Sequence, residues 1–261
     1  YWWTSFIIVS LYLTGIFSLK KYMEKRKPFN LRFPLTIWSS VMTLFAVVGT
    51  IRCLPEFIDI LSQPNGFYQS ICNSSYYKDI RLNVWYWIFI MLKIIELGDT
   101  VFIVLRKKPL TSLHLVHHST SLIFSWFVFG DVPGTARWMV NMNFAIHSFM
   151  YGYYTLKAME YQIPRRIAAT ITMSQIIQMI IGTYVNVKAF QYKMTGTHCD
   201  LSKPVATAGA FIYTTFFILF LNFFIHSYII KLLFKTEKTI KFIDSDSETD
   251  EANNNLKKKF E

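Results

Sequence analysis

The chain has 261 residues, of which 52% are hydrophobic and only 16% are charged, a balance that argues against an ordinary water-soluble domain. Its formal net charge of +11 is typical of proteins that bind nucleic acid or an anionic membrane surface. An aromatic content of 18%, together with long apolar runs, excludes a disordered chain. Three cysteines are too few for a disulfide scaffold, and no paired spacing of cysteine and histidine indicates a zinc site.

Apolar segments long enough to cross a bilayer occupy more than half of the chain, since a spanning helix needs about 20 residues. In chain order, we predict membrane-spanning helices over residues 2–19, 33–51, 82–105, 110–129, 138–156, 167–187 and 205–230. The predicted fold class is all-α, a polytopic membrane protein with seven transmembrane helices. We expect one transmembrane domain over residues 1–235 and a disordered tail over residues 236–261. The first span lacks the flanks of a signal peptide, and we expect further sequence ahead of Tyr1.

Basic residues gather on one side of these spans. Of the 27 Lys and Arg residues, 19 lie in connections 20–32, 106–108 and 157–166 or after residue 230, and seven lie on the opposite side. The positive-inside rule places the richer side in the cytosol. We therefore predict a lumenal N-terminus and a cytosolic C-terminus, and we expect no nucleic-acid partner because membrane topology accounts for most of the charge.

Two further features agree with this orientation. Asn73 begins a glycosylation sequon in the predicted non-cytosolic loop 53–81. Cys72 and Cys199 also lie in non-cytosolic connections, where a disulfide can persist, although the sequence does not give their distance. At the other end, Lys258 and Lys259 resemble a dilysine retrieval signal, while a solvated basic tail is the plainer interpretation. We expect a multi-pass protein of the endoplasmic-reticulum membrane.

Four of the spans carry polar or ionisable residues at helical spacing, which are costly in a bilayer and indicate function. They are Lys93, Glu96, Asp99 and Thr100 in the third span, His114, His117 and His118 in the fourth, Asn143, His147, Tyr151 and Tyr154 in the fifth, and Thr172, Gln175 and Gln178 in the sixth. At 1.5 Å per residue, all four sets lie roughly 6–18 Å from the cytosolic boundary. Because alternating helices bring them to one layer, we predict one polar pocket that opens toward the cytosol.

Structural interpretations of these residues stay open. In one structural interpretation, an ion pair forms between Lys93 and Glu96, which are three residues apart, with Asp99 as its third member. The residues of the sixth span form interhelical hydrogen bonds in another.

Three kinds of chemistry fit such a pocket. Imidazole binds iron, copper and zinc, and a similar histidine spacing occurs in membrane di-iron desaturases and hydroxylases, but four histidines are few for two irons. A transporter or receptor with a polar midplane site is a second interpretation. That interpretation is weakened because the polar layer lies nearer one face and no span is interrupted by Gly or Pro at that depth. In the third, imidazole itself acts as nucleophile or acid–base group.

These motifs, in this order, resemble those of the ELO family of very-long-chain fatty-acid elongases, over essentially the whole chain. The matching residues are Lys93, Glu96, Asp99 and Thr100; His114, His117 and His118; Asn143, His147 and Met150 through Tyr154; and Thr172, Gln175 and Gln178. The segment from Glu96 to Lys107 is most similar to the branch that handles saturated and monounsaturated chains near C16.

The resemblance implies a 3-ketoacyl-CoA synthase that condenses an acyl-CoA with malonyl-CoA and releases carbon dioxide. It implies that helices two to seven form a closed barrel around an acyl tunnel. It also implies no cofactor and no resident metal, with the reductases and dehydratase of the elongation cycle as partners and a homo-oligomer as one possible state. Candidates for binding the CoA phosphates are Arg106, Lys107, Lys108, Lys157, Arg165, Arg166 and Lys231.

Our mechanistic hypothesis assigns roles to the polar layer. His117 attacks the thioester and carries the acyl group, while His114 or His118 orients it or moves protons. His147 and Asn143 bind malonyl-CoA and stabilise the enolate. The remaining substrate-binding candidates are Lys93, Glu96, Asp99, Tyr151, Tyr154, Thr172, Gln175 and Gln178. Direct attack by the malonyl carbanion, without an acyl-enzyme, is the alternative mechanism.

Overall fold

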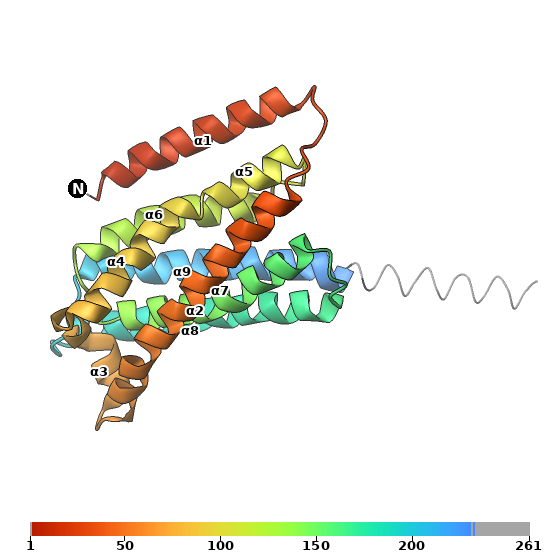
Figure 1. The fold of residues 1–261 in the computed structure, drawn as a ribbon. Helices are drawn as coiled ribbons and strands as arrows, with labels where there is room; N and C mark the ends of the chain where they lie inside the picture. Colours follow the sequence, from red (N-terminus) through yellow and green to blue (C-terminus); the bar gives the residue numbers. More distant parts are fainter. Residues whose placement is uncertain (1, 231, 233–261) are drawn as a thin grey trace, which may run out of the picture. The chain divides into compact units, whose positions relative to one another are not determined.

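Every regular element in the described residues of the computed structural model, residues 2–230 and 232, is helical. In chain order they are α1 (Thr4–Met23), α2 (Arg32–Ser62), α3 (Gly66–Cys72), η1 (Ser75–Lys78), α4 (Ile80–Ile95), α5 (Gly98–Leu105), α6 (Ser112–Phe129), α7 (Ala136–Ala158), α8 (Arg165–Met194), α9 (Lys203–Phe224) and η2 (Ile225–Ile230) (Figure 1). The all-helical class is confirmed. Lys231 and the predicted tail with its dilysine pair lie outside the described residues.

The chain divides into two compact units, Tyr1–Phe220 and Leu221–Glu261. The first contains all the helices from α1 to α8 and most of α9. The described part of the second contains the end of α9 and the π-helix η2. All predicted polar sets lie in the first unit, so the site is described within it alone.

Within residues 2–230 and 232, four helical stretches are both long and apolar enough to cross a membrane: α1, α2, α8 and Lys203–Ile230. The other three predicted spans correspond to α4 with α5, to α6 and to α7. These helices carry the lysine and carboxylates, the histidine triplet and the asparagine–histidine pair, and such side chains lower the hydropathy of a segment. The protein is therefore a helical membrane protein by composition, and the three predicted spans outside these four stretches contain most of the predicted site.

The third predicted span is not one continuous helix, and the prediction of a single helix over residues 82–105 was wrong in that respect. It is divided into α4 and α5, with Glu96 and Leu97 between them. Both residues keep right-handed helical dihedral angles, but the amide of Leu97 donates to Ile94 O (3.2 Å) and that of Asp99 to Glu96 O (3.1 Å). These three-residue hydrogen bonds tighten the helix into a 3₁₀-type turn, a feature frequent at functional positions.

The most extensive helix pair is α2 with α7. The two helices approach closely at Gly49, where an added Cβ would lie 2.8 Å from ring atoms of Phe144. Small residues at such crossings are typical of membrane proteins, in which helices associate through packing and hydrogen bonds because lipid is as apolar as the side chains. The pair forms one wall of the core that also includes Phe89 and Tyr151.

The helix α1 packs on α5 and α6 (Figure 1). Its buried residues Val9, Ile16 and Met23 recur every seven positions, which places them on one face of the helix. Val9 packs with Leu97 and Leu122, while Ile16 and Met23 pack with Val104. The inward face of α1 is thus a mostly apolar seam.

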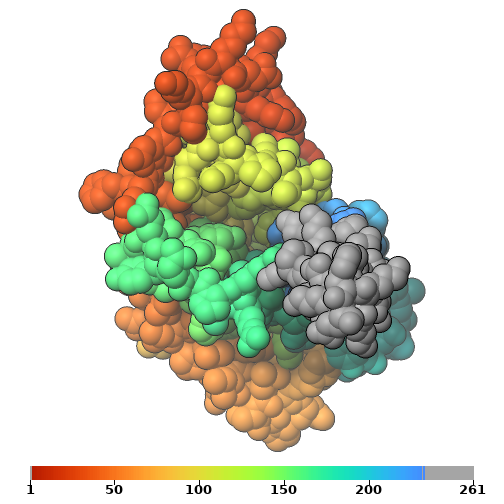
Figure 2. Space-filling model, turned by 90° about the vertical axis from the view of Figure 1, so that its right-hand side faces the viewer, coloured from red at the N-terminus to blue at the C-terminus, as the bar shows by residue number. Residues whose placement is uncertain are grey.

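The end of the unit that we expect to face the cytosol is tied by contacts between its connections (Figure 2). The amide of Phe29 donates to Leu105 O (3.0 Å), and Lys107 Nζ donates to Glu24 O (3.1 Å). Arg32 donates to the carbonyls at the end of α7 and forms an ion pair with Glu160 (2.8 Å). These contacts hold together the ends of α1, α5 and α7 with the beginning of α2.

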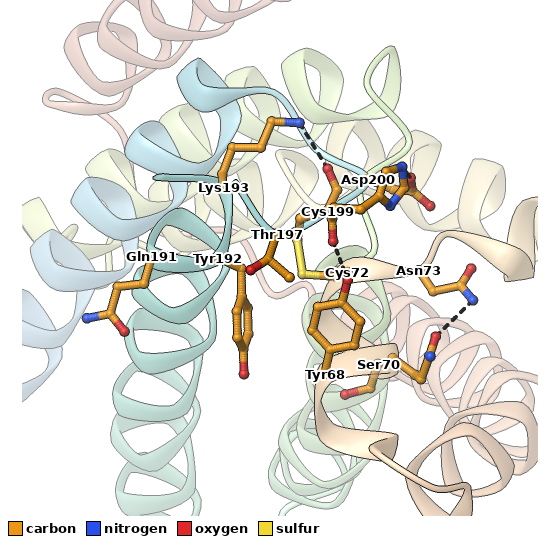
Figure 3. The surroundings of a disulfide bond; sticks show 12 residues. Tyr68, Ser70, Cys72, Asn73, Gln191, Tyr192, Lys193, Thr197, Cys199 and Asp200 are labelled. Atoms are coloured by element: carbon orange, nitrogen blue, oxygen red, sulfur yellow. Dashed lines mark hydrogen bonds and ion pairs between the residues drawn. A yellow bond between two sulfur atoms is a disulfide. The ribbon is translucent and has the colours of Figure 1, made fainter. Parts of the chain in front are cut away.

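At the opposite end, Cys72 and Cys199 form a disulfide that joins the end of α3 to the connection between α8 and α9 (Figure 3). The amide of Asp200 donates to Cys72 O (2.8 Å), and Lys193 Nζ donates to Cys199 O (3.0 Å). Tyr68 donates its hydroxyl to the carbonyl of His198. The two connections therefore form one cross-linked cap.

A buried arginine completes this cap. Arg137 at the start of α7 is fully buried and pairs with Glu56 (Nε to Oε1, 2.8 Å). Its other nitrogens donate to Asn73 O and to Ser75 Oγ (2.7 Å for Ser75). The Asn73 side chain donates to Gln69 Oε1 (3.1 Å) and accepts from the amide of Ser75 (2.9 Å). The residues of the predicted sequon are therefore engaged in the packing of the cap.

Candidate active site

Lys93 on α4 is the centre of a buried polar network. Its Nζ lies 2.8 Å from Glu96 Oε1, so the ion pair considered from the sequence is present. The same Nζ donates to Asn143 Oδ1 on α7 (2.9 Å). Both members of the ion pair are almost fully buried, Lys93 at 5% and Glu96 at 3% exposure. A buried charge pair is tolerated when its remaining donors and acceptors are satisfied, and Asn143 satisfies one of the lysine donors.

This network assigns the tautomer of His147. A lysine ammonium can only donate, so the Asn143 atom beside it must be the oxygen, and the amide nitrogen faces His147 Nε2 (3.1 Å). His147 Nε2 is therefore the acceptor, and the ring carries its hydrogen on Nδ1, which lies 3.4 Å from Glu96 Oε1. Both ring nitrogens are committed, which suits His147 to holding Asn143 in place more than to attacking a substrate.

Asp99 is not a third member of that ion pair. Its two carboxylate oxygens accept hydrogen bonds from Trp38 Nε1 on α2 (2.6 Å) and from the Tyr151 hydroxyl on α7 (2.7 Å). The approach of Trp38 requires Gly98, since an added Cβ there would lie 2.6 Å from the indole ring. The 3₁₀-type turn thus lets Glu96 and Asp99 serve different partners although they are only three residues apart.

The histidine box lies on α6. Thr111 caps the start of this helix, because its Oγ1 accepts a hydrogen bond from the amide of His114 (3.3 Å). The ring centroids of His114 and His118 are 4.2 Å apart, and those of His117 and His118 are 5.4 Å apart and nearly perpendicular. His114 Nε2 is hydrogen-bonded to Thr100 Oγ1 on α5 (2.8 Å). His117 instead packs on Phe216 of α9, with ring centroids 4.8 Å apart.

A cavity in the described residues joins the polar layer to an apolar interior. Its polar wall contains Lys93, His117, Asn143 and Gln178. The rest of the lining is largely aromatic and aliphatic. It continues along α4, α6 and α7 to Tyr76, Phe129 and Pro133. Among the four histidines of the polar layer, His117 alone lines this cavity. The arrangement presents one imidazole, one ammonium and two amides at the end of a long apolar space.

Of the other predicted site residues, only some lie at this cavity. Gln178 lines the cavity and is hydrogen-bonded to the Tyr213 hydroxyl, whereas Gln175 Nε2 contacts Met150 Sδ (3.3 Å) and Thr172 bonds Ala168 O within its own helix (3.0 Å). The ring of Tyr154 is exposed, with its centroid 6.2 Å from that of Tyr151. The predicted phosphate-binding residues within the described ranges do not line the cavity; they are Arg106, Lys107, Lys108, Lys157, Arg165 and Arg166.

Three contributors were missed from the sequence: Trp38, Tyr12 and Tyr213. Each is an aromatic residue inside a predicted span, and each has an N–H or O–H that needs a partner when it is buried. That need was a usable signal for Trp38 and Tyr12, which meet Asp99 and Thr100. Within residues 2–230 and 232, no group of three or more His, Cys, Asp or Glu side chains is arranged to hold a metal ion.

Comparison with known proteins agrees with the motifs. The sequence matches the model of the ELO family, described as the GNS1/SUR4 family, over residues 1–235. The chain belongs to the ELO family.

Its similarity to curated members extends over most of both chains, and three examples are as follows. The chain is 41% identical over 231 residues to very long chain fatty acid elongase 6 of Drosophila melanogaster, covering 87% of this chain and 73% of that protein. It is 37% identical over 229 residues to human very long chain fatty acid elongase 3, covering 88% and 84%. It is 36% identical over 222 residues to long chain fatty acid elongase 1 of Caenorhabditis elegans, covering 85% and 77%.

Proposed function

We propose that this ELO-family protein is a 3-ketoacyl-CoA synthase that condenses a long-chain acyl-CoA with malonyl-CoA. The observation that carries the proposal is the cavity, in which His117, Lys93 and Asn143 stand at the end of a long apolar lining. An imidazole is a suitable nucleophile for a thioester, and the apolar lining suits an acyl chain. The names of the relatives, which are fatty acid elongases, support the same reaction class.

The size of the cavity supports a long acyl chain. From His117 to Phe129, both in its lining, α6 rises about 18 Å at 1.5 Å per residue. A saturated chain rises about 1.25 Å per carbon, given a carbon–carbon bond of about 1.5 Å and an angle near 111°. This stretch of α6 therefore matches the length of about 14 carbons beyond a carbonyl held at His117. This length supports acyl chains near C16 as substrates.

In the first step, a ring nitrogen of His117 attacks the thioester carbon. A carbon–nitrogen bond forms and the carbon–sulfur bond breaks. The CoA thiolate takes the proton of the imidazole and leaves as the thiol. His117 suits this role because it lines the cavity, whereas His114 and His147 have ring nitrogens already committed to Thr100, Asn143 and Glu96. The product is a neutral acyl-imidazole inside the cavity.

In the second step, malonyl-CoA loses carbon dioxide, and the enolate carbon attacks the acyl-imidazole. The carbon–nitrogen bond breaks, and the imidazole recovers a proton as the 3-ketoacyl-CoA is released, two carbons longer. Asn143 lines the cavity and has an amide hydrogen beyond the one that faces His147, so it can donate to the developing enolate oxygen, and the positive charge of Lys93 in the same lining stabilises that oxygen. Neither step requires a metal or another cofactor.

We further propose seven membrane spans, with the second to seventh enclosing the acyl tunnel, in the endoplasmic-reticulum membrane. The disulfide between Cys72 and Cys199 supports a lumenal position for the cap, since such bonds persist in oxidising compartments. Exposed basic residues on the other side, such as Arg165 and Arg166, would then meet the CoA phosphates in the cytosol. The reductases and dehydratase that process 3-ketoacyl-CoA are the expected partners.

Asn73 offers a test of this orientation. A shift in electrophoretic mobility that is removed by endoglycosidase and is absent in Asn73→Gln would support the lumenal position. Labelling of an introduced cap cysteine by an impermeant reagent from the cytosolic side would contradict it.

The central experiment incubates purified protein with malonyl-CoA and a series of acyl-CoA chain lengths, and it identifies products by mass spectrometry. We expect 3-ketoacyl-CoA products, greatest for chains near C16, and their absence would overturn the proposed function. Incubation with acyl-CoA alone separates the two mechanisms. An acyl group on His117 together with free CoA supports the covalent route, whereas intact acyl-CoA and unmodified protein support direct attack.

A further inference from the structure

A chain of hydrogen bonds leads from α1 into the histidine box. The Tyr12 hydroxyl lies 2.7 Å from Thr100 Oγ1, and the same Oγ1 lies 2.8 Å from His114 Nε2. Thr100 is fully buried, and in the described residues its hydroxyl contacts no other hydrogen-bonding group. Three helices, α1, α5 and α6, contribute one side chain each to this chain.

Counting hydrogens gives the chain a direction. Each hydroxyl has a single hydrogen, and a buried hydrogen without an acceptor costs free energy. If Tyr12 donates to Thr100 and Thr100 donates to His114 Nε2, both hydroxyl hydrogens have an acceptor. If His114 donates instead, either Tyr12 or Thr100 is left with an unpaired hydrogen. The balanced arrangement makes His114 an acceptor at Nε2, with its own hydrogen on Nδ1.

The packing of α1 fixes the position of the Tyr12 hydroxyl. The tyrosine ring lies between two apolar clusters, one around Val9 and Leu97 and the other around Ile16 and Val104. Both clusters join α1 to the helices that carry the site. A hydroxyl mounted on a ring held on both sides is pre-oriented toward Thr100, and its donation strengthens the hydrogen bond that Thr100 makes in turn.

We propose that Thr100 is a positioning residue that holds His114 in its Nδ1–H tautomer, and that Tyr12 of α1 fixes the Thr100 hydroxyl. The inference rests on the proposed function, because its effect reaches the reaction through His114. The His114 ring packs against His118 with the two planes tilted by 38°, and His118 contacts the His117 ring at the cavity. The first helix therefore contributes to the orientation of the proposed nucleophile without touching substrate.

Kinetics of matched variants test the positioning role. Thr100→Val, which keeps the shape and removes the hydroxyl, should lower kcat roughly tenfold with little change in KM for acyl-CoA, and Tyr12→Phe roughly threefold, as expected for single hydrogen bonds. Thr100→Ser should restore most of the rate. Tyr12→Phe with Thr100→Val should be no slower than Thr100→Val alone, because both changes break one chain. Ser10→Ala, whose hydroxyl bonds only to Phe6 O within α1 in the described structure, is the control and should match the unmodified protein.

A tautomer measurement separates this inference from the proposed function. Nitrogen-15 NMR of histidine-labelled protein should show His114, assigned by its loss in His114→Gln, as the Nδ1–H form, and as a tautomer mixture in Thr100→Val. An Nε2–H ring in the unmodified protein would overturn the proposal. A fall in thermal stability with unchanged kcat in Thr100→Val and Tyr12→Phe would also overturn it, since that result shows a structural contact only. Absence of condensation by the unmodified protein would overturn the proposed function and leave the tautomer result intact.

Discussion

Lys93 and Arg137 are both buried cations paired with a glutamate at 2.8 Å, yet they lie in regions of different character. The guanidinium group of Arg137 donates hydrogen bonds to Glu56, Asn73 and Ser75, and these contacts join α7 to the disulfide-linked cap. Lys93 pairs with Glu96 and Asn143 but also lines the cavity. The comparison teaches that a buried charge does not by itself mark a site of chemistry. What distinguishes Lys93 from Arg137 is its position in the lining of the cavity.

The largest effect on the reactive side of this comparison is expected at His117. His117→Ala removes the proposed nucleophile and should lower the condensation rate at least about 10³-fold, as for other covalent catalysts. The apparent midpoint of thermal unfolding should stay close to that of the unmodified protein. His198→Ala, in the exposed cap loop, is the matched control and should retain full activity. Substantial acyl-enzyme formation by His117→Ala would refute the assignment.

Lys93→Met should lower the rate about 10²-fold, the usual cost of losing one electrostatic contact to a developing oxyanion. It also leaves Glu96 buried without its cation, so stability should fall. Adding Glu96→Gln removes that charge and should recover stability without recovering the rate. Recovery of both stability and rate would show that Lys93 has a structural role, as Arg137 has, and that the two cations do not differ in function.

Arg137→Met should have the converse outcome. Loss of its contacts should lower the free energy of unfolding by about 3 kcal/mol, at the lower end for a broken buried pair because Glu56 retains 24% exposure. The fraction that folds should condense acyl-CoA within about twofold of the normal rate, because Arg137 does not line the cavity. A detergent thermal-shift assay with active-site titration separates the two quantities. A large loss of kcat in folded protein would contradict this expectation.

The disulfide should have the smallest effect of the four on the reaction. Replacing both Cys72 and Cys199 by serine opens a loop with a sequence separation of 127 residues and should cost about 2–4 kcal/mol of stability. The rate per folded molecule should not change. A reducing agent should reproduce the loss of stability in the unmodified protein and have no effect on the double variant.

The sequence predicted the helical class and the residues of the polar layer because both follow from local spacing. Steps of three and four residues place Lys93 with Glu96 and Asn143 with His147 on shared helix faces, and the structure contains both contacts. The helices that carry these pairs were recognisable from their unusual polarity within apolar segments.

The sequence did not predict contacts that join distant segments. Trp38 and Asp99 are separated by 61 positions, and Tyr12 and Thr100 by 88, so no periodicity relates them. The tight turn at Glu96 and Leu97 was missed because neither residue breaks a helix by propensity. Its geometry accompanies the different tertiary partners of the two carboxylates, His147 for Glu96 and Trp38 with Tyr151 for Asp99.

Gly98 gives the molecule an unusual vulnerability to mutation. The residue has an ordinary helical backbone, so a comparison of amino-acid propensities would rank alanine as an improvement there. A single methyl group at Gly98 would nevertheless push the Trp38 indole away from Asp99. The indole is one of the two donors that hold this carboxylate. In a saturation survey of the gene, this position should therefore tolerate almost no codon but glycine, while the polar residues around it should still accept close analogues.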